Sequence, residues 1–251
     1  MSMSFYVIIP ARYDSERLPG KVCLDIEGKT MLQRTYEQAI KSEAKQIIIA
    51  TDDNRIRELA HCFGAKVFMT SSRHRSGTER VQQVITEMKL DDKEVVVNVQ
   101  ADEPLIPPSA IDRVAKSLIE REETGISTLC EQISDNTEIN NPNAVKVVLN
   151  NENEALYFSR APIPYNSGKD LKSYYRHVGI YAYRVKVLHQ FVGWPVSELE
   201  ASENLEQLRA LQNGIRIHVD ISRDKIPAGI DTEKDLELVR KSLSSTNNAP
   251  Q

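Results

Sequence analysis

Short apolar runs rich in Val and Ile alternate with amphipathic helical segments along the first half of this 251-residue chain. Five runs have the length and composition of buried strands, at residues 5–9, 46–50, 66–69, 94–99 and 125–130. Four segments between them have apolar residues at helical spacing, at 31–42, 54–63, 78–88 and 108–119. Strands joined by helices of this length form right-handed crossovers. The pattern therefore predicts an α/β fold with a mainly parallel central sheet and flanking helices.

The second half of the chain has a different pattern, in which polar turns that contain proline separate the predicted strands. These strands cover residues 144–149, 154–158, 177–183 and 215–219. Helices are predicted at 186–191, 204–212 and 232–243, and the polar tail 244–251 is expected to be disordered. No low-complexity linker interrupts the chain. We therefore expect one α/β domain over 1–251, with an inserted β-rich substrate-binding region at about 140–195.

The composition excludes several classes of protein. The 36 acidic and 32 basic residues give a net charge of −4, so neither nucleic acid nor a membrane is an expected partner. No uncharged run approaches the roughly 20 residues of a membrane helix, and no signal peptide is expected. The widely spaced Cys23, Cys62 and Cys130 indicate neither a disulfide framework nor a zinc site. We expect a cytoplasmic protein.

The loop after the first predicted strand has the features of a phosphate-binding loop. Arg12 supplies a planar guanidinium, Lys21 supplies a point charge, and Gly20 lets the backbone approach a phosphate closely. Ligands of such sheets bind beyond the carboxyl ends of the strands, where this loop lies. The loop is not a Walker A motif, and the chain has no G-x-G dinucleotide fingerprint. A solvated surface loop, partly neutralised by its acidic residues, is the alternative.

Eight motifs follow one another along the chain. The first is Ile-Pro-Ala-Arg-Tyr-Asp-Ser-Glu-Arg-Leu-Pro-Gly-Lys at 9–21. The others are HRSGTER at 74–80, NVQADEP at 98–104, NPNAVKVV at 141–148, FSRAPIP at 158–164, HVGIYAY at 177–183, LEQLR at 205–209 and GIDT at 229–232. Together they resemble the CMP-sugar synthetases, in particular the 3-deoxy-manno-octulosonate (Kdo) cytidylyltransferase family. The resemblance extends from residue 5 to about residue 240.

The resemblance implies a nucleotide-diphosphosugar-transferase-like fold and a Mg²⁺-dependent reaction. CTP and Kdo would be the substrates, and the anomeric hydroxyl of Kdo would attack the α-phosphorus of CTP in line. CMP-Kdo, used in lipopolysaccharide assembly, and pyrophosphate would be the products. Members of the family are usually homodimers, so the inserted region at about 140–195 is also expected to mediate dimerisation.

The resemblance further implies that Asp102 and Asp231 bind the Mg²⁺ ion. Mg²⁺ takes few protein oxygens and completes its shell with substrate phosphates and water, so two distant carboxylates suffice. Taken alone, Asp102 fits a turn residue before Pro104, and Asp231 fits the N-terminal cap of the last helix. Asp52 and Asp53, after the second predicted strand, are predicted to cap the following helix rather than to bind metal.

The residues that the resemblance assigns to the site form three further sets. The catalytic set is Arg12, Lys21 and Asp102. The nucleotide-binding set is Pro10, Ala11, Arg12, Ser15, Lys21, Ser76, Gly77 and Arg80. The sugar-binding set, whose side chains suit a carboxylate and hydroxyl groups, is Gln100, Arg160, His177, Tyr181, Glu206 and Gln207. An ordinary helix cap at Ser76 and core packing at Tyr181 are the competing interpretations.

One departure from the family and three rival functions stay open. Ala101 stands where the family usually has glycine, which costs stability if the backbone φ is positive and is harmless otherwise. The first rival is CMP-activation of a related acid, such as 8-amino-Kdo or a sialic or legionaminic-type acid. The second is a non-catalytic nucleotide-binding module. The third is a sugar-1-phosphate nucleotidylyltransferase, whose Gly-rich loop is missing here.

Overall fold

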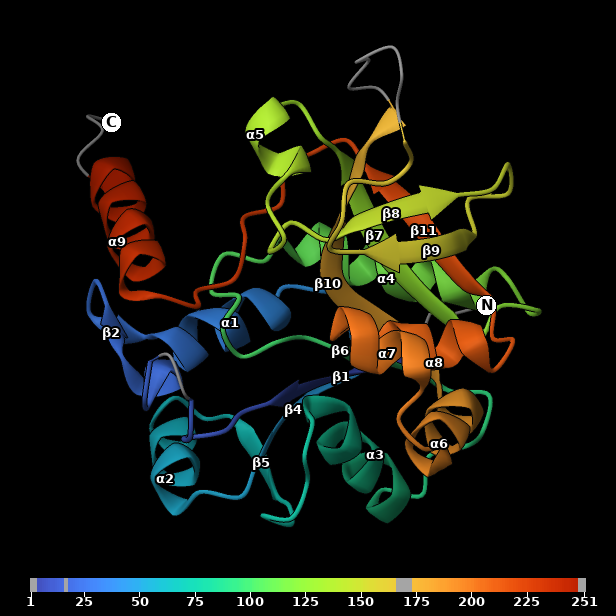
Figure 1. Ribbon diagram of the computed structural model, residues 1–251. Helices are drawn as coiled ribbons and strands as arrows, with labels where there is room; N and C mark the ends of the chain where they lie inside the picture. The colour runs from blue at the N-terminus through green and yellow to red at the C-terminus, as the bar shows by residue number, and fades with distance from the viewer. Residues whose placement is uncertain (1–3, 16–17, 166–172, 248–251) are drawn as a thin grey trace. The chain divides into compact units, whose positions relative to one another are not determined.

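The computed structural model describes residues 4–15, 18–165 and 173–247 (Figure 1). The chain divides into two compact units. Unit 1 consists of Met1–Phe5, Leu90–Val97 and Ala110–Ile226, and unit 2 consists of Tyr6–Lys89, Asn98–Ser109 and Pro227–Gln251. The expectation of one domain with an inserted region stays a prediction, as does dimerisation through about 140–195, of which 166–172 lie outside the described residues.

Unit 2 contains a parallel sheet flanked by helices. Its strands, in spatial order, are β1 (Phe5–Pro10), β4 (Gln46–Thr51) and β5 (Lys66–Met69). Its helices are η1 (Lys21–Cys23, a 3-10 helix), α1 (Met31–Ala39), α2 (Asn54–Cys62), α3 (Gly77–Glu87) and α9 (Glu233–Asn247). A two-stranded hairpin of β2 (Asp25–Ile26) and β3 (Lys29–Thr30) completes the unit. The predicted strand–helix alternation is confirmed here.

Unit 1 contains a mixed sheet. Its main strands, in spatial order, are β11 (Ile217–Ser222), β7 (Ile126–Gln132), β10 (Tyr175–Arg184) and β6 (Val95–Asn98). β7 is parallel to β11 and antiparallel to β10. β10 also pairs antiparallel with β8 (Lys146–Leu149), which pairs with β9 (Ala155–Ser159). The helices are α4 (Pro108–Ile119), α5 (Asn136–Ile139), α6 (Val185–Gly193), α7 (Glu198–Glu203) and α8 (Gln207–Gln212).

Most predicted helices differ from the observed ones by one to four residues at an end, and two of these differences are informative. The helix predicted at 204–212 is wrong at its start, because Asn204 ends α7 in the left-handed region with φ 51° and α8 begins at Gln207. The last helix continues to Asn247, so the first four residues of the tail predicted to be disordered are helical. Residues 248–251 lie outside the described residues.

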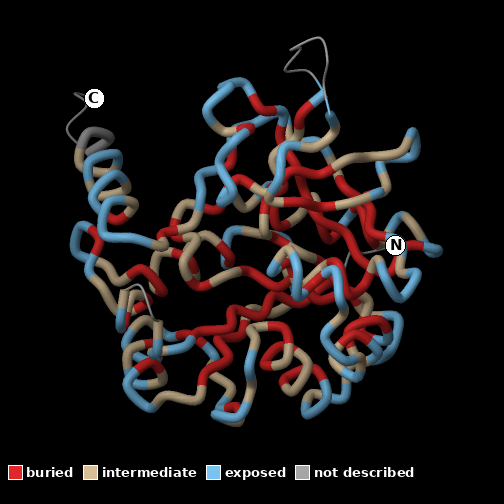
Figure 2. Tube along the Cα trace, in the orientation of Figure 1, coloured by how far each residue is buried: buried red, intermediate tan, exposed pale blue. Residues whose placement is uncertain are grey.

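The apolar runs predicted as strands form much of the hydrophobic core. All six residues of β1 are buried, and so are the four residues of β6. Figure 2 shows the buried residues concentrated along the strands, with exposed residues on the outer faces of the helices. Among the residues that the structure describes, no helix combines the length and apolar character needed to cross a membrane.

Candidate active site

A cavity of about 670 Å³ in unit 2 brings together three segments that are far apart in sequence. These are the loop after β1, the turn after β6 and the segment before α9. Among the predicted site residues, the cavity is lined by Pro10, Arg12, Ser15, Lys21, Gln100, Asp102 and Asp231. The structure therefore places both predicted metal ligands and all three predicted catalytic residues in one cavity.

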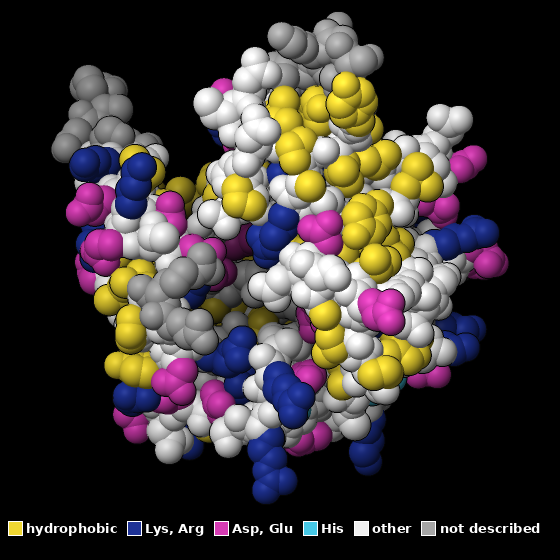
Figure 3. Space-filling model, in the orientation of Figure 1, with side chains coloured by type: hydrophobic (Ala, Val, Ile, Leu, Met, Phe, Trp, Pro, Cys, Tyr) yellow, Lys and Arg dark blue, Asp and Glu magenta, His cyan; other side chains and the backbone are white. Residues whose placement is uncertain are grey.

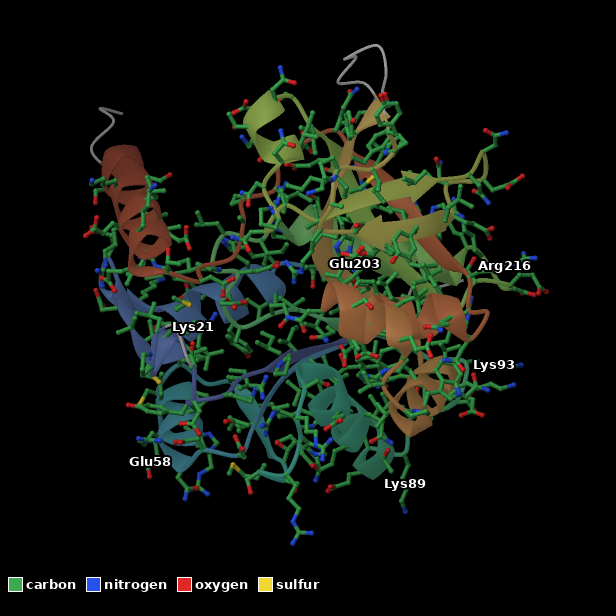
Figure 4. The ribbon with its side chains drawn as sticks, viewed as in Figure 1. Lys21, Glu58, Lys89, Lys93, Glu203 and Arg216 are labelled. Atoms are coloured by element: carbon green, nitrogen blue, oxygen red, sulfur yellow. The ribbon has the colours of Figure 1, made fainter. Side chains whose placement is uncertain are left out.

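Lys21, which is labelled in Figure 4, contacts both predicted metal ligands. Its Nζ donates hydrogen bonds to Asp102 Oδ2 at 2.5 Å, Asp231 Oδ1 at 3.0 Å and the carbonyl oxygen of Ile230 at 3.1 Å. An ammonium has three protons, so these three acceptors use all of them. The Lys21 side chain is 14% exposed, against 25% for Asp102 and 45% for Asp231. One cation thus holds two carboxylates that are 129 positions apart in the sequence.

The charge of Lys21 is maintained by its partners. Partial burial by itself lowers the pKa of Lys21, since it penalises the charged form. The attraction of Asp102, reinforced by Asp231, outweighs this effect and holds the pKa above its ordinary value. Lys21 is therefore a cation at neutral pH, with the charge required to bind a phosphate.

Backbone hydrogen bonds position the two carboxylates. The Ile230 amide donates to the Asp102 carbonyl at 2.9 Å, which joins the segment before α9 to the turn after β6. The two segments pass close to each other, since a Cβ on Gly229 would lie 3.4 Å from the Asp102 carbonyl oxygen, in van der Waals contact. The Ala101 carbonyl accepts a 3.1 Å bond from Thr35 Oγ1 in α1. Ala101 is not among the described residues with positive φ, so its methyl group causes no backbone strain.

The backbone before Lys21 is equally constrained. Gly20 has φ 67°, a left-handed conformation that favours glycine, and its amide donates to the Tyr13 carbonyl at 2.9 Å. A Cβ on Gly20 would also meet the Tyr13 ring at 3.1 Å. This turn leads directly into η1, where Lys21 is the first residue. The loop's glycine, predicted to allow close approach to a phosphate, here lets the chain turn sharply enough to aim Lys21 into the cavity.

The second predicted nucleotide-binding segment lies beside the first. Arg12 Nη1 donates to the Arg75 carbonyl at 3.1 Å, and a Cβ on Gly77 would lie 3.1 Å from Pro10 Cγ. Ser76 caps α3 by accepting a bond from the Glu79 amide at 3.2 Å. The helix N-terminus therefore lies next to the end of β1, where its positive dipole end suits an anion.

Four predicted nucleotide-binding residues are not among those lining the cavity: Ala11, Ser76, Gly77 and Arg80. Ala11 is fully buried, and its amide donates to the Ala50 carbonyl at 2.8 Å. Ser76 is occupied as the cap of α3. Arg80 is fully buried, donates to Thr70 Oγ1 and lies 3.2 Å from Asp52 Oδ2. Burial lowers the pKa of Arg80, and Asp52 opposes that effect. Arg80 therefore lies in the interior of unit 2, paired with Asp52.

The predicted sugar-binding residues other than Gln100 belong to unit 1. Arg160 donates to three backbone carbonyl oxygens, those of Glu203 at 2.8 Å, Pro142 at 2.9 Å and Asn204 at 3.2 Å. Its own amide donates to Glu203 Oε2 at 2.9 Å, so Arg160 ties the end of β9 to the end of α7. Glu203 is labelled in Figure 4. Most of the N–H groups of Arg160 are used in these hydrogen bonds to the backbone and to Glu203.

His177 and Tyr181 lie on β10, with their ring centroids 5.3 Å apart. His177 is 9% exposed, and its Nε2 lies 3.0 Å from Thr128 Oγ1. Burial, followed by the positive charge of Arg176, lowers the pKa of His177 to about 3, so its imidazole is neutral at pH 7. Burial likewise raises the pKa of Tyr181, with Tyr183 and Glu206 adding to the effect. Tyr181 is partly exposed and its ring stacks on that of Tyr183, so both interpretations of this residue, core packing and sugar binding, stay open.

Glu206 and Gln207 stand at the start of α8. Glu206 occupies the N-cap position without a side-chain cap, and Gln207 is the first helical residue. Both are partly exposed. The buried ion pair of Arg209 with Glu200, at 2.5 Å, ties α8 to α7 and so holds both residues in place. Arg160 and Tyr181 have the same intermediate exposure, and only His177 is buried.

Several residues of the site were not predicted. Four of them line the cavity: Asp14, Pro19, Val22 and Ala101. Asp14 lies within the first motif, so its position next to Arg12 was a signal already in the sequence. Ile230 lies within the last motif, at 229–232, whereas Thr35, which also positions the Asp102 turn, carries no such signal. Their role depends on a helix and a loop that only the folded chain brings together.

Comparisons with known proteins agree with this geometry. The family model described as cytidylyltransferase matches residues 6–217. The chain belongs to the cytidylyltransferase family. A Kdo cytidylyltransferase from Coxiella burnetii (strain RSA 493 / Nine Mile phase I) is 51% identical over 246 residues, which cover 95% of this chain and 99% of that protein. One from Hahella chejuensis is 49% identical over 253 residues, covering 97% and 99%. The family resemblance predicted from the eight motifs is confirmed.

Solved structures of cytidylyltransferases show the same fold. The structure of CMP:2-keto-3-deoxy-manno-octonic acid synthetase complexed with CTP matches with a TM-score of 0.91 and 39% identity, covering 97% of this chain and 99% of that one. A 4-diphosphocytidyl-2C-methyl-D-erythritol synthase matches with a TM-score of 0.65 at 13% identity, which shows the fold alone. The predicted nucleotidyltransferase-like fold class is confirmed.

The donor set of the cavity fits a magnesium ion that also binds phosphate. Asp102 and Asp231 point their carboxylates at one position, which Lys21 Nζ holds. Among the described residues, no group of three or more His, Cys, Asp or Glu side chains is placed to bind a metal ion with protein ligands alone. Two carboxylates are the number expected where substrate phosphates and water supply the remaining oxygens. The site thus fits an ion that arrives with a nucleotide.

The environment of His177 predicts how stability depends on pH. The folded chain holds this histidine neutral down to about pH 3, whereas an unfolded chain protonates it near pH 6.5. Between these values protonation favours unfolding, so the free energy of unfolding falls with falling pH, by up to about 1.4 kcal/mol per pH unit. In His177→Gln this contribution should be absent. Urea unfolding of both proteins at several pH values between about 4 and 6 measures it, and equal slopes would contradict the assignment.

Proposed function

We propose that this chain transfers the cytidylyl group of CTP to Kdo, giving CMP-Kdo and pyrophosphate. The observation that carries the proposal is the convergence of Lys21, Asp102 and Asp231 in the cavity that Arg12 and Ser15 also line. The Kdo cytidylyltransferases that share about half of its residues over nearly the full chain support the choice of both substrates. The CTP-bound structural relative supports the choice of nucleotide.

The chemistry follows from the charges of the cavity. The anomeric hydroxyl of Kdo attacks the α-phosphorus of CTP, its proton is released, and the bond to the pyrophosphate oxygen breaks. Arg12 and Lys21 bind the triphosphate and stabilise the negative charge that develops on it. Asp102 and Asp231 would hold Mg²⁺, which when bound would polarise the phosphate oxygens. Fixing the two substrates in line supplies a further part of the acceleration.

The sugar acid is assigned to groups of unit 1. Glu206 and Gln207 suit the hydroxyl groups of Kdo, because both are partly exposed and can accept or donate hydrogen bonds. Arg160 suits the carboxylate through the N–H groups that its backbone partners leave unused. His177 and Tyr181 shape this region from the interior of the sheet.

The substrate assignment is tested by pyrophosphate release. The purified protein with Mg²⁺ should release pyrophosphate from CTP and Kdo, and should prefer CTP to UTP. With CTP, Kdo should exceed 8-amino-Kdo and sialic acid in kcat/KM. A higher kcat/KM with 8-amino-Kdo or sialic acid would assign the chain to that sugar acid. Nucleotide binding without any pyrophosphate release would indicate a non-catalytic module.

The metal assignment is tested by Asp102→Asn, which keeps the shape of the side chain and removes its charge. Loss of a metal ligand should lower kcat by about a thousandfold or more while the protein stays folded. Asp53→Asn is the matched control, because Asp53 caps α2 and is not among the residues lining the cavity. Unchanged turnover in Asp102→Asn, with folding checked by circular dichroism, would overturn the role of Asp102.

We further propose that the protein works as a cytoplasmic homodimer that supplies CMP-Kdo for lipopolysaccharide assembly. All three cysteines are free, which agrees with a reducing compartment. Unit 1 exposes large apolar side chains in and next to the region expected to dimerise, with Leu156 59% and Tyr165 92% exposed. Figure 3 shows hydrophobic side chains gathered over the face that carries β8 and β9. Such a patch is typical of a protein interface.

The dimer is tested by placing a charge in this patch. Leu156→Glu should shift the protein from dimer to monomer in size-exclusion chromatography with light scattering, because an interface core disfavours an unpaired charge. Leu238→Glu is the control, since Leu238 is 57% exposed but lies on α9 in unit 2. A dimer that persists in Leu156→Glu would place the interface elsewhere, and a monomeric unaltered protein would refute the dimer.

A further inference from the structure

The cluster around Lys21 has the form of a cation site that the protein fills with its own side chain. Three oxygens converge on the ammonium: Asp102 Oδ2, Asp231 Oδ1 and the carbonyl oxygen of Ile230. The same two carboxylates are the oxygens assigned to the divalent ion. The ammonium and that ion therefore compete for the same two carboxylates.

We propose that Lys21 keeps divalent metal out of this site until a nucleoside triphosphate binds, so that metal binding depends on the nucleotide. The inference rests on the function proposed above, because it takes the triphosphate and Mg²⁺ as the ligands of this cavity. It adds an order of events at the site, in which the triphosphate draws Lys21 away and the metal takes its place.

Without nucleotide, the net free energy of metal binding at this site is small. To bind both carboxylates it must displace the ammonium, which then loses two carboxylate partners and remains in a cavity that also contains Arg12. The divalent ion and the ammonium would also repel each other at short range. The unliganded site is therefore stable with Lys21 bound, and a metal ion alone does not replace it.

A triphosphate changes this balance because it supplies new anionic partners. Lys21 lines the cavity, so its ammonium can move from the carboxylates to phosphate oxygens without leaving it. The metal then binds the two carboxylates together with phosphate oxygens, which completes the oxygen shell that Mg²⁺ requires. Every charge remains paired after the exchange. The nucleotide and the metal thus promote each other's binding, and this coupling is reciprocal.

The backbone of this region allows the exchange to occur in the side chain alone. The left-handed turn at Gly20 is held by its bond to the Tyr13 carbonyl, and the Cys23 amide donates to the Gly20 carbonyl at 2.9 Å. Asp102 and the segment before Asp231 are joined by the Ile230 amide. The four-carbon stem of the lysine is the flexible element, whereas both ends of the site are fixed.

The experiment measures Mn²⁺ binding to nucleotide-free protein by electron paramagnetic resonance. Lys21→Met removes the ammonium and should bind Mn²⁺ at least about tenfold more tightly than the unaltered protein. Lys21→Gln should behave in the same way, and Lys21→Arg, which keeps the positive charge, should not. Lys29→Met is the matched control, since Lys29 pairs with Glu37 at 2.7 Å and is not among the residues lining the cavity. Its Mn²⁺ affinity should be unchanged.

Two results would overturn the proposal. One is equal Mn²⁺ affinity in Lys21→Met and the unaltered protein. The other is tight binding that survives Asp102→Asn in the Lys21→Met background, because the ion would then lie elsewhere. If neither neutral variant folds, the unaltered protein is compared with Asp102→Asn. Equally weak binding without nucleotide supports the proposal, and weaker binding in Asp102→Asn contradicts it.

These measurements do not depend on turnover. Loss of the expected Mn²⁺ difference, with pyrophosphate still released from CTP and Kdo, would reject the exchange and leave the proposed function intact. The expected Mn²⁺ difference without pyrophosphate release would support the exchange and reject the substrate assignment.

Discussion

The contact of one lysine with two aspartates determines the character of the site. Lys21, Asp102 and Asp231 come from three separate segments, and their charges meet within hydrogen-bonding distance. Two carboxylates this close would repel each other without a cation between them. The arrangement therefore requires a positive charge at this position, either the ammonium of Lys21 or a metal ion. The geometry of unit 2, from the Gly20 turn to the Ile230 hydrogen bond, places these groups together.

Charge pairing also separates the residues that can bind ligands from those that stabilise the fold. Lys21, Arg12 and the two aspartates carry charge at a cavity, where solvent and ligand can exchange with their partners. Arg80 and Arg209 are also charged, but they are buried and paired with Asp52 and Glu200. Removing one member of a buried pair leaves an uncompensated charge in the interior. Such pairs therefore stabilise the fold and do not bind a substrate.

Most of the secondary structure could be predicted from apolar patterns, because the strands are short apolar runs and some of them, such as β1 and β6, are buried throughout. The short elements η1, β2, β3, α5 and α7 were missed, since a segment of two to six residues carries too little pattern to be recognised. Asn204 shows a further limit. The pattern predicted a helix that starts at this residue, but its left-handed backbone ends α7, and α8 begins only at Gln207. Local backbone conformation overrode the pattern.

The sequence by itself determined the family, because motifs such as 9–21 and 98–104 resemble those of the Kdo cytidylyltransferases in residues and in order, and the expected chemistry came with that resemblance. The cap at Asp53 could be predicted in the same way, since capping is a local interaction. Only the tertiary structure decided which candidates reach a ligand cavity. Asp102 and Asp231 meet there, whereas Arg80 and His177 are buried and Arg160 binds backbone carbonyls. Burial and side-chain pairing depend on segments distant in the sequence, so no local pattern records them.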